Sequence, residues 1–84
     1  MSRQAILLPD LGMQTEEIKF GAWLRQPGEP VHAGEDLFEV EADKATVVCE
    51  AELDGVLAEL VVTGGDVQQG QLLGYMDTVE EQDE

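Results

Sequence analysis

The stretch EVEADKATVVCEA, residues 39–51, contains two runs of alternating side chains on either side of a charged pair, Asp43 and Lys44. Apolar residues occupy every second position in and beside these runs: Phe38, Val40 and Ala42 before the pair, and Ala45, Val47 and Cys49 after it. Alternation with a period of two is typical of half-buried β-strands. The stretch therefore predicts a β-hairpin whose two-residue loop is Asp43-Lys44.

Three apolar pairs define the expected register of this hairpin: Ala42 with Ala45, Val40 with Val47, and Phe38 with Cys49. In this register both strands turn their apolar sides toward one core, whereas a slip by one residue would place Glu41 opposite Val47. Asp is common in such loops, but Lys is not a strong turn residue. Lys44 is one of only two lysines in the chain, so its place at the hairpin tip needs another reason.

Working outward, the sequence predicts further short strands separated by turns. Residues 4–8 form an apolar run that ends at Pro9. In residues 18–24 every second side chain is apolar, which predicts a half-buried strand, and Trp23 falls on the face opposite these side chains, where we expect it to be a packing residue. The turn at residues 27–30 contains two prolines, which exclude a helix, and a second turn follows at Gly34.

The second half of the chain repeats the first at a spacing of 36 residues. Six identities support the repeat: Ala22 and Ala58, Leu24 and Leu60, Gly28 and Gly64, Val31 and Val67, Gly34 and Gly70, and Leu37 and Leu73. Each half reads as strand, glycine turn, short valine segment, glycine turn and strand, and the four glycines are expected to be structural. We therefore expect an all-β fold, a flattened sandwich or barrel of two short antiparallel sheets with quasi-twofold symmetry. The hairpin at Lys44 has no counterpart, so it should mark one end, with the termini near the other.

Composition limits the class of protein. The 84 residues are enough for one small domain, expected over residues 1–79, with a disordered acidic tail at 80–84. Nineteen acidic residues oppose four basic ones, a net charge of −15 that disfavours nucleic acid and anionic membranes and favours partners with basic faces. No apolar run reaches the roughly 20 residues of a membrane helix, and no signal peptide is recognisable.

The residues that usually carry chemistry are few. Cys49 has no cysteine partner for a disulfide, and its position in the alternation predicts a buried apolar side chain. His32 lies in a polar turn without a Ser or Cys partner, so we expect no catalytic residues and no metal site. A reducing, intracellular setting is expected.

An ordered set of motifs resembles the lipoyl domain, the acyl-carrying module of 2-oxoacid dehydrogenase complexes in the biotinyl/lipoyl carrier family. The matching motifs in the first half are LPDLGM at 8–13, the spaced set Glu16, Glu17, Trp23 and Leu24, and PGEPVHAG at 27–34. They are followed by EADKA at 41–45, by Asp54-Gly55, and by GGDVQQGQLL at 64–73. Three positions depart from the usual pattern: Ala42 stands for threonine, Ile18 for glycine and Glu29 for aspartate. The fold that the resemblance implies is the barrel-sandwich hybrid.

The resemblance implies that Lys44 carries covalent (R)-lipoic acid as a swinging arm, with Asp43 and Ala45 as flanking recognition residues. The domain would be a carrier without its own active site, either free-standing or part of a dihydrolipoamide acyltransferase, and monomeric. Implied partners are a lipoate ligase or lipoyl/octanoyl transferase, a thiamin-dependent 2-oxoacid decarboxylase, the acyltransferase core and a flavin-dependent dihydrolipoamide dehydrogenase. The implied location is the bacterial cytoplasm, or the mitochondrial matrix in a eukaryote.

Other functions stay open at this point. A biotin carboxyl carrier shares the architecture but usually flanks its lysine with methionines, whereas Met13 and Met76 lie far from Lys44 in the sequence. The lipoyl carrier of glycine cleavage is longer and has a different site. A docking module would leave Lys44 unmodified. Whichever function holds, Asp43 fits a turn residue as well as a recognition residue.

Overall fold

A computed structural model describes residues 2–11, 17–42 and 45–78, and all regular structure within these ranges is β-strand. The eight strands are β1 (Ser2–Leu7), β2 (Ile18–Trp23), β3 (Pro30–Val31), β4 (Asp36–Ala42), β5 (Ala45–Glu50), β6 (Gly55–Leu60), β7 (Asp66–Val67) and β8 (Leu72–Thr78). No helix in the described ranges is long and apolar enough to cross a membrane.

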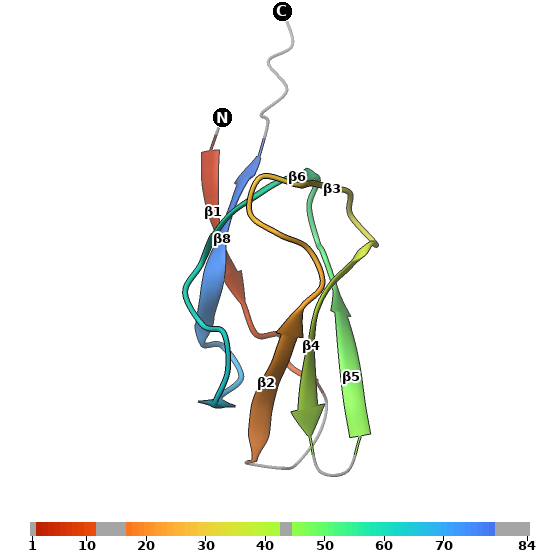
Figure 1. The fold of residues 1–84 in the computed structure, drawn as a ribbon, viewed down its shortest axis with the longest axis vertical. Helices are drawn as coiled ribbons and strands as arrows, with labels where there is room; N and C mark the ends of the chain where they lie inside the picture. The colour runs from red at the N-terminus through yellow and green to blue at the C-terminus, as the bar shows by residue number, and fades with distance from the viewer. Residues whose placement is uncertain (1, 12–16, 43–44, 79–84) are drawn as a thin grey trace, which may run out of the picture.

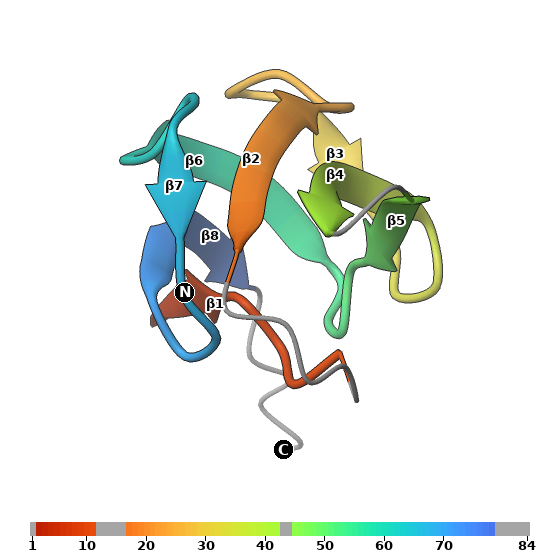
Figure 2. The same cartoon turned by 90° about the horizontal axis from the view of Figure 1, so that it is seen from below.

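Two four-stranded sheets face each other, with strand orders β1-β8-β6-β3 and β5-β4-β2-β7 (Figure 1, Figure 2). Every strand pairing is antiparallel. The predicted all-β sandwich is confirmed, in the form of an open sandwich rather than a closed barrel, because both sheets keep free edges. The short strands are exchanged between the sheets: β3 pairs with β6, and β7 pairs with β2.

The internal repeat is also confirmed, and backbone hydrogen bonds recur at equivalent positions in both halves. The Leu24 amide donates to the Leu37 carbonyl at 2.9 Å, and the Val61 amide donates to the Leu73 carbonyl at the same distance. In the later turns, the Glu35 carboxylate accepts from the His32 amide, and the Gln71 side chain accepts from the Gln68 amide. The same turn is thus built twice.

The expected spacing of 36 residues is correct only for the second part of each half. Gly34 and Gly70, with φ of 93° and 87°, are 36 residues apart, but the earlier turns have positive φ at Gly28 (95°) and Gly65 (85°), which are 37 apart. The alignment of Gly28 with Gly64 is therefore wrong by one residue. The second half regains the register because it has one residue fewer between this glycine and the following valine of β7.

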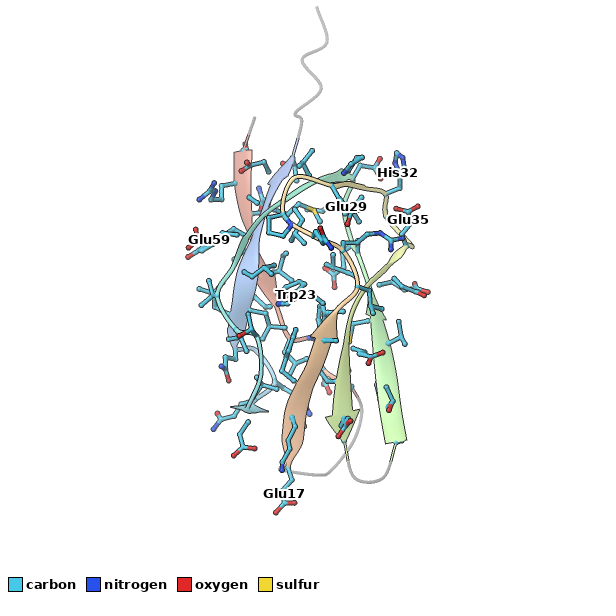
Figure 3. All side chains as sticks on the ribbon, viewed as in Figure 1. Glu17, Trp23, Glu29, His32, Glu35 and Glu59 are labelled. Carbon is cyan, nitrogen blue, oxygen red and sulfur yellow. The ribbon has the colours of Figure 1, made fainter. Side chains whose placement is uncertain are left out.

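The expected orientation of Trp23 is wrong for a local reason. The register between β2 and β4 shifts between Phe20 and Ala22, which makes Gly21 the extra residue of a β-bulge. Beyond the bulge the alternation is inverted, so the Trp23 ring packs on the core, 5.3 Å from the Phe20 ring and 5.4 Å from the Phe38 ring. Trp23 is a packing residue as predicted, but on the inner face (Figure 3).

The core lies between the sheets and draws side chains from nearly every strand. Its buried apolar members are Leu8, Ile18, Phe20, Val31, Leu37, Phe38, Val40, Ala42, Cys49, Ala51, Leu57, Val67, Leu73 and Met76. At one end of the molecule β1 and β8 pair through Ser2 and Thr78, and at the other end β4 and β5 pair through Ala42 and Ala45. Figure 1 shows these two ends far apart, as the sequence predicted; residues 79–84, including the predicted tail, lie outside the described ranges.

Candidate functional site

The register of the β4–β5 hairpin is as predicted. Ala42 pairs with Ala45, Val40 with Val47, and Phe38 with Cys49. Two of the three predicted site residues, Asp43 and Lys44, lie outside the described ranges, and the third, Ala45, is exposed at the first position of β5. The ladder therefore leaves only two residues to join paired strand ends, and Lys44 directly precedes Ala45 in the sequence.

The base of the hairpin is held by an apolar row that crosses the whole sheet. Val67 of β7 pairs with Ile18 of β2, Ile18 also pairs with Ala42 of β4, and Ala42 pairs with Ala45 of β5. Val67 and Ile18 are each 2% exposed and Ala42 is fully buried. Four strands thus meet at the last ladder pair before the loop, which gives the loop a fixed base.

The neighbouring row carries alternating charge on the outer face. Asp66, Lys19, Glu41 and Thr46 follow one another across the same four strands. Lys19, the second lysine of the chain, therefore lies inside a sheet with an acidic residue in register on each side. Its backbone lies within a four-strand ladder, whereas Lys44 falls in the two-residue connection between paired strand ends.

Further acidic residues lie at this end of the molecule. Figure 3 shows Glu17 where β2 begins, close to the ends of β4 and β5, and the Glu41 side chain is exposed one residue before Ala42. A partner that reads this end therefore meets carboxylates beside the hairpin. Such a surface favours a partner with basic side chains.

Two of the unusual residues noted in the sequence, Ile18 and Ala42, are cross-strand neighbours. The large side chain at position 18 and the small one at position 42 both point into the core, so together they fill one layer of it. A threonine at position 42 would bury a hydroxyl group next to Ile18. Neither departure from the usual pattern therefore disturbs the hairpin, because each accommodates the other.

The other reactive side chains take no part in this region. Cys49 is buried, as predicted, and this burial raises the pKa of its thiol above its ordinary value. His32 and Asp54 approach to 3.8 Å between Nδ1 and Oδ1, with both side chains about three-quarters exposed. Among the described residues no cluster of His, Cys, Asp and Glu has the arrangement of a metal site.

The structure thus combines a β4–β5 hairpin, anchored at its base by β2 and β7, with a two-sheet sandwich whose two halves repeat each other. Residues 4–76 match the family model described as "Biotin-requiring enzyme". A solved lipoyl domain, that of the 2-oxoglutarate dehydrogenase complex from Azotobacter vinelandii, superposes with a TM-score of 0.67 at 34% identity, covering 86% of this chain and 92% of that one. The chain is a lipoyl domain of this family.

Similar sequences in longer proteins agree with this assignment. The pyruvate dehydrogenase protein X component of Mus musculus is 42% identical over 73 residues, covering 84% of this chain and 15% of that protein. The succinyltransferase component of the Bacillus subtilis 2-oxoglutarate dehydrogenase complex is 43% identical over 70 residues, covering 82% of this chain and 17% of that protein. The lipoyl domain described here thus spans less than a fifth of each of these relatives.

Sequence reasoning missed one contribution to the site. It identified the hairpin and its register, but not that β7 completes its base through Val67 and Asp66. The internal repeat predicts a short valine segment within residues 64–73, yet nothing in the repeat says which sheet this segment joins. That pairing joins Val67 to Ile18, which is 49 positions earlier in the chain, so no local signal carries it.

Proposed function

We propose that this lipoyl domain carries lipoic acid in amide linkage on Lys44 and presents it to successive active sites of a 2-oxoacid or acetoin dehydrogenase complex. The observation that carries the proposal is the pairing of Ala42 with Ala45, because it assigns Lys44 to the two-residue connection of the hairpin. Residues in such connections are accessible to other enzymes, whereas Lys19 is part of a four-strand ladder.

When bound, a lipoyl group supplies a dithiolane that accepts an acyl group together with two electrons and is later reoxidised. The residues of this chain do the presenting. The row from Val67 through Ile18 to Ala42 anchors the strand end from which the lipoyl-lysine would be presented. The tethered arm then keeps a high effective concentration at each active site that the domain visits.

The proposed partners follow from this role. They are a lipoate ligase or lipoyl/octanoyl transferase, a thiamin-dependent decarboxylase, an acyltransferase core and a flavin-dependent dihydrolipoamide dehydrogenase. The relatives named above are components of such complexes, which supports the proposal, and the carboxylates of Glu17 and Glu41 near the hairpin would meet basic residues on these enzymes. Attachment itself would occur in whichever compartment holds the complex.

The decisive experiment is attachment mapping. The protein is produced in lipoate-competent cells, its intact mass is measured, and modified peptides are sequenced by mass spectrometry. We expect one lipoyl group, on Lys44, in the wild type and in Lys19→Arg, and none in Lys44→Arg. Lipoyl on Lys19, or an unmodified protein in the presence of an active ligase, would overturn the proposal in favour of another carrier lysine or a pure docking module.

Biotin is the second candidate, since the matching family model includes biotin-requiring enzymes. The two ligases must distinguish similar hairpins, and we infer that Asp43 and Ala45 are among the features they read. Replacing both residues with methionine is expected to slow lipoylation and permit some biotinylation, because specificity is a difference between two affinities. Full lipoylation of this double variant, with no biotin incorporated, would show that the flanking side chains are not recognised.

A further inference from the structure

A groove of about 320 Å³ opens between β1 and the turn that follows β5. One wall is the backbone and side chains of residues 4–9, and the opposite wall is formed by Glu50, Glu52 and Leu53. The floor includes the core residues Phe38, Cys49 and Met76.

The β1 wall is a free sheet edge. β1 is the outermost strand of its sheet and pairs only with β8, so over residues 3–7 the outer row of backbone N–H and C=O groups faces no other strand in the described part of the chain. Free edges of this kind accept an additional extended strand through main-chain hydrogen bonds. The edge is also long enough for a specific register, since β1 spans six residues.

The edge strand β1 carries little charge. The segment SRQAIL contains no acidic residue in a chain of net charge −15. Its one charged residue, Arg3, is engaged on the outer face of the sheet, where Nε lies 3.2 Å from Asp77 and Nη1 lies 3.5 Å from Glu59. No carboxylate on β1 would therefore repel or pair with an incoming strand.

The rim of the groove combines apolar and acidic side chains. Leu7 and Leu53 border it and are 51% and 47% exposed, which makes them two of the four exposed large hydrophobic residues in the described ranges. Both charged residues that line it, Glu50 and Glu52, are exposed carboxylates without an ion-pair partner among the described residues. The groove thus offers an apolar slot bordered by unneutralised negative charge.

We propose that this groove binds an extended segment of a partner protein in which apolar residues alternate with Lys or Arg. The segment adds to the edge of β1, its apolar side chains enter between Leu7 and Leu53, and its cations pair with Glu50 and Glu52. In an extended strand alternate side chains point in opposite directions, which suits a site with an apolar floor and an acidic rim. A second copy of this chain is disfavoured as the occupant because two bodies of charge −15 repel each other.

This binding site goes beyond the carrier role and does not depend on it. Phe38 and Cys49 lie four ladder pairs from Ala42 and Ala45, which is about 13 Å along the strands. A segment held in the groove therefore leaves the hairpin accessible. Such docking would keep the domain close to a partner while Lys44 engages an active site, and unmodified protein is sufficient to test it.

The test uses a blocked heptapeptide of alternating Lys and Val and two control peptides, one with Ser in place of Val and one with Glu in place of Lys. Binding to ¹⁵N-labelled protein is followed by NMR chemical shifts and by amide hydrogen exchange. We expect the Lys/Val peptide to shift resonances of β1 and residues 50–53 and to slow exchange of the outer amides of β1. Both control peptides should bind at least about tenfold more weakly.

Variants make the assignment specific. Leu53→Ser should weaken the Lys/Val peptide about tenfold, whereas Val61→Ser, a change at an equally exposed residue outside the groove, should not. The double change Glu50→Gln and Glu52→Gln should reduce the salt dependence of binding. The dispersion of the NMR spectrum confirms that each variant is folded.

Three outcomes would overturn the proposal. Equal binding of the Lys/Val and Lys/Ser peptides would show attraction to the acidic surface alone. Shifts that avoid β1 would place the binding elsewhere, and concentration-dependent dimerisation that protects the β1 amides without peptide would make a second copy the occupant. Loss of lipoylation in the mapping experiment, by contrast, would leave this inference untouched.

Discussion

At the scale of single residues, the domain separates the lysine that is proposed to react from the side chains that hold the fold. Ala42, directly before the connection, is fully buried, whereas Ala45, directly after it, is exposed. The transition from core to surface therefore takes place within one ladder pair. Function and stability should respond to different residues on the two sides of that pair.

Lys44→Arg is the simplest test of this separation. It retains the charge but removes the primary amine that an amide linkage requires, so lipoylation and carrier activity should be lost. The free energy of unfolding should change by no more than about 0.5 kcal/mol, because exposed substitutions away from special features have small effects. Intact-mass analysis and thermal unfolding measure the two effects, and a variant that failed to fold would place Lys44 in the core instead.

Cys49 gives a prediction for pH. Burial raises the pKa of its thiol, so above about pH 9 the unfolded chain releases this proton while the folded chain retains it. Unfolding then becomes more favourable as pH rises, and this contribution disappears below about pH 9, where both states are protonated. Because the thiolate is the nucleophile, the raised pKa also lowers the reactivity of Cys49 toward disulfides.

The pH effect is isolated by comparison with Cys49→Ala. The free energy of unfolding, measured by urea denaturation between about pH 8 and pH 10, should fall more steeply for the wild type than for the variant. The two proteins differ only at position 49, so contributions from the rest of the chain cancel in the difference. Parallel curves would show that the thiol ionises as easily in the folded state as in the unfolded one.

At the scale of the elements, the turns determine where each strand begins. Two adjacent glycines in the turn after β6 have different roles: Gly65 has a φ of 85°, whereas Gly64 is not in the positive-φ region. A side chain added at either residue would meet no atom within 4 Å. Backbone conformation alone therefore distinguishes these two positions.

Gly65→Ala should destabilise the domain by about 1–2 kcal/mol, because an L-residue is strained in the left-handed region. Gly64→Ala should be neutral or slightly stabilising, since it restricts the unfolded chain without strain in the folded one. Chemical denaturation of the two variants beside the wild type measures both. The opposite order would restore the spacing of 36 residues that the sequence identities suggest.

At the scale of the whole molecule, Trp23 connects the two sheets. It belongs to β2, yet its indole Nε1 donates to the carbonyl of Val62 at 2.7 Å, in the segment that follows β6 of the opposite sheet. Gly74 of β8 provides the space, because a Cβ atom there would lie 3.2 Å from the Trp23 ring and 2.5 Å from the Glu59 carbonyl oxygen. The bulge at Gly21, the absence of a side chain at Gly74 and the indole therefore act together.

Trp23→Phe should lower the free energy of unfolding by about 1–3 kcal/mol, through loss of the hydrogen bond and of packed volume between the sheets. Tyr75→Phe is the matched control, because it also changes an aromatic residue but keeps the ring in place. The Tyr75 ring lies on the outer face, with its centroid 5.6 Å from Cζ of Arg3. Urea unfolding followed by circular dichroism measures both variants. Equal stability of Trp23→Phe and Tyr75→Phe would mean that the indole does not connect the sheets.

Much of this molecule was determined by its sequence alone. The period-two alternation around Asp43-Lys44 specified the β4–β5 hairpin and its register, because a slip would bury carboxylates. The repeated glycines specified the doubled sandwich, and the alternation placed Cys49 inside. The hairpin and the burial of Cys49 follow from the alternation of neighbouring residues, and the doubling follows from a repeat that is visible along the chain.

Tertiary structure decided the rest. The exchange of β3 and β7 between the sheets, and with it the contribution of Val67 to the hairpin base, depends on contacts between distant parts of the chain. The bulge at Gly21 turned Trp23 inward against a strict alternation, because the space beside Gly74 and the Val62 carbonyl lies on the opposite sheet. No local pattern records such partners, since they exist only once both sheets have formed.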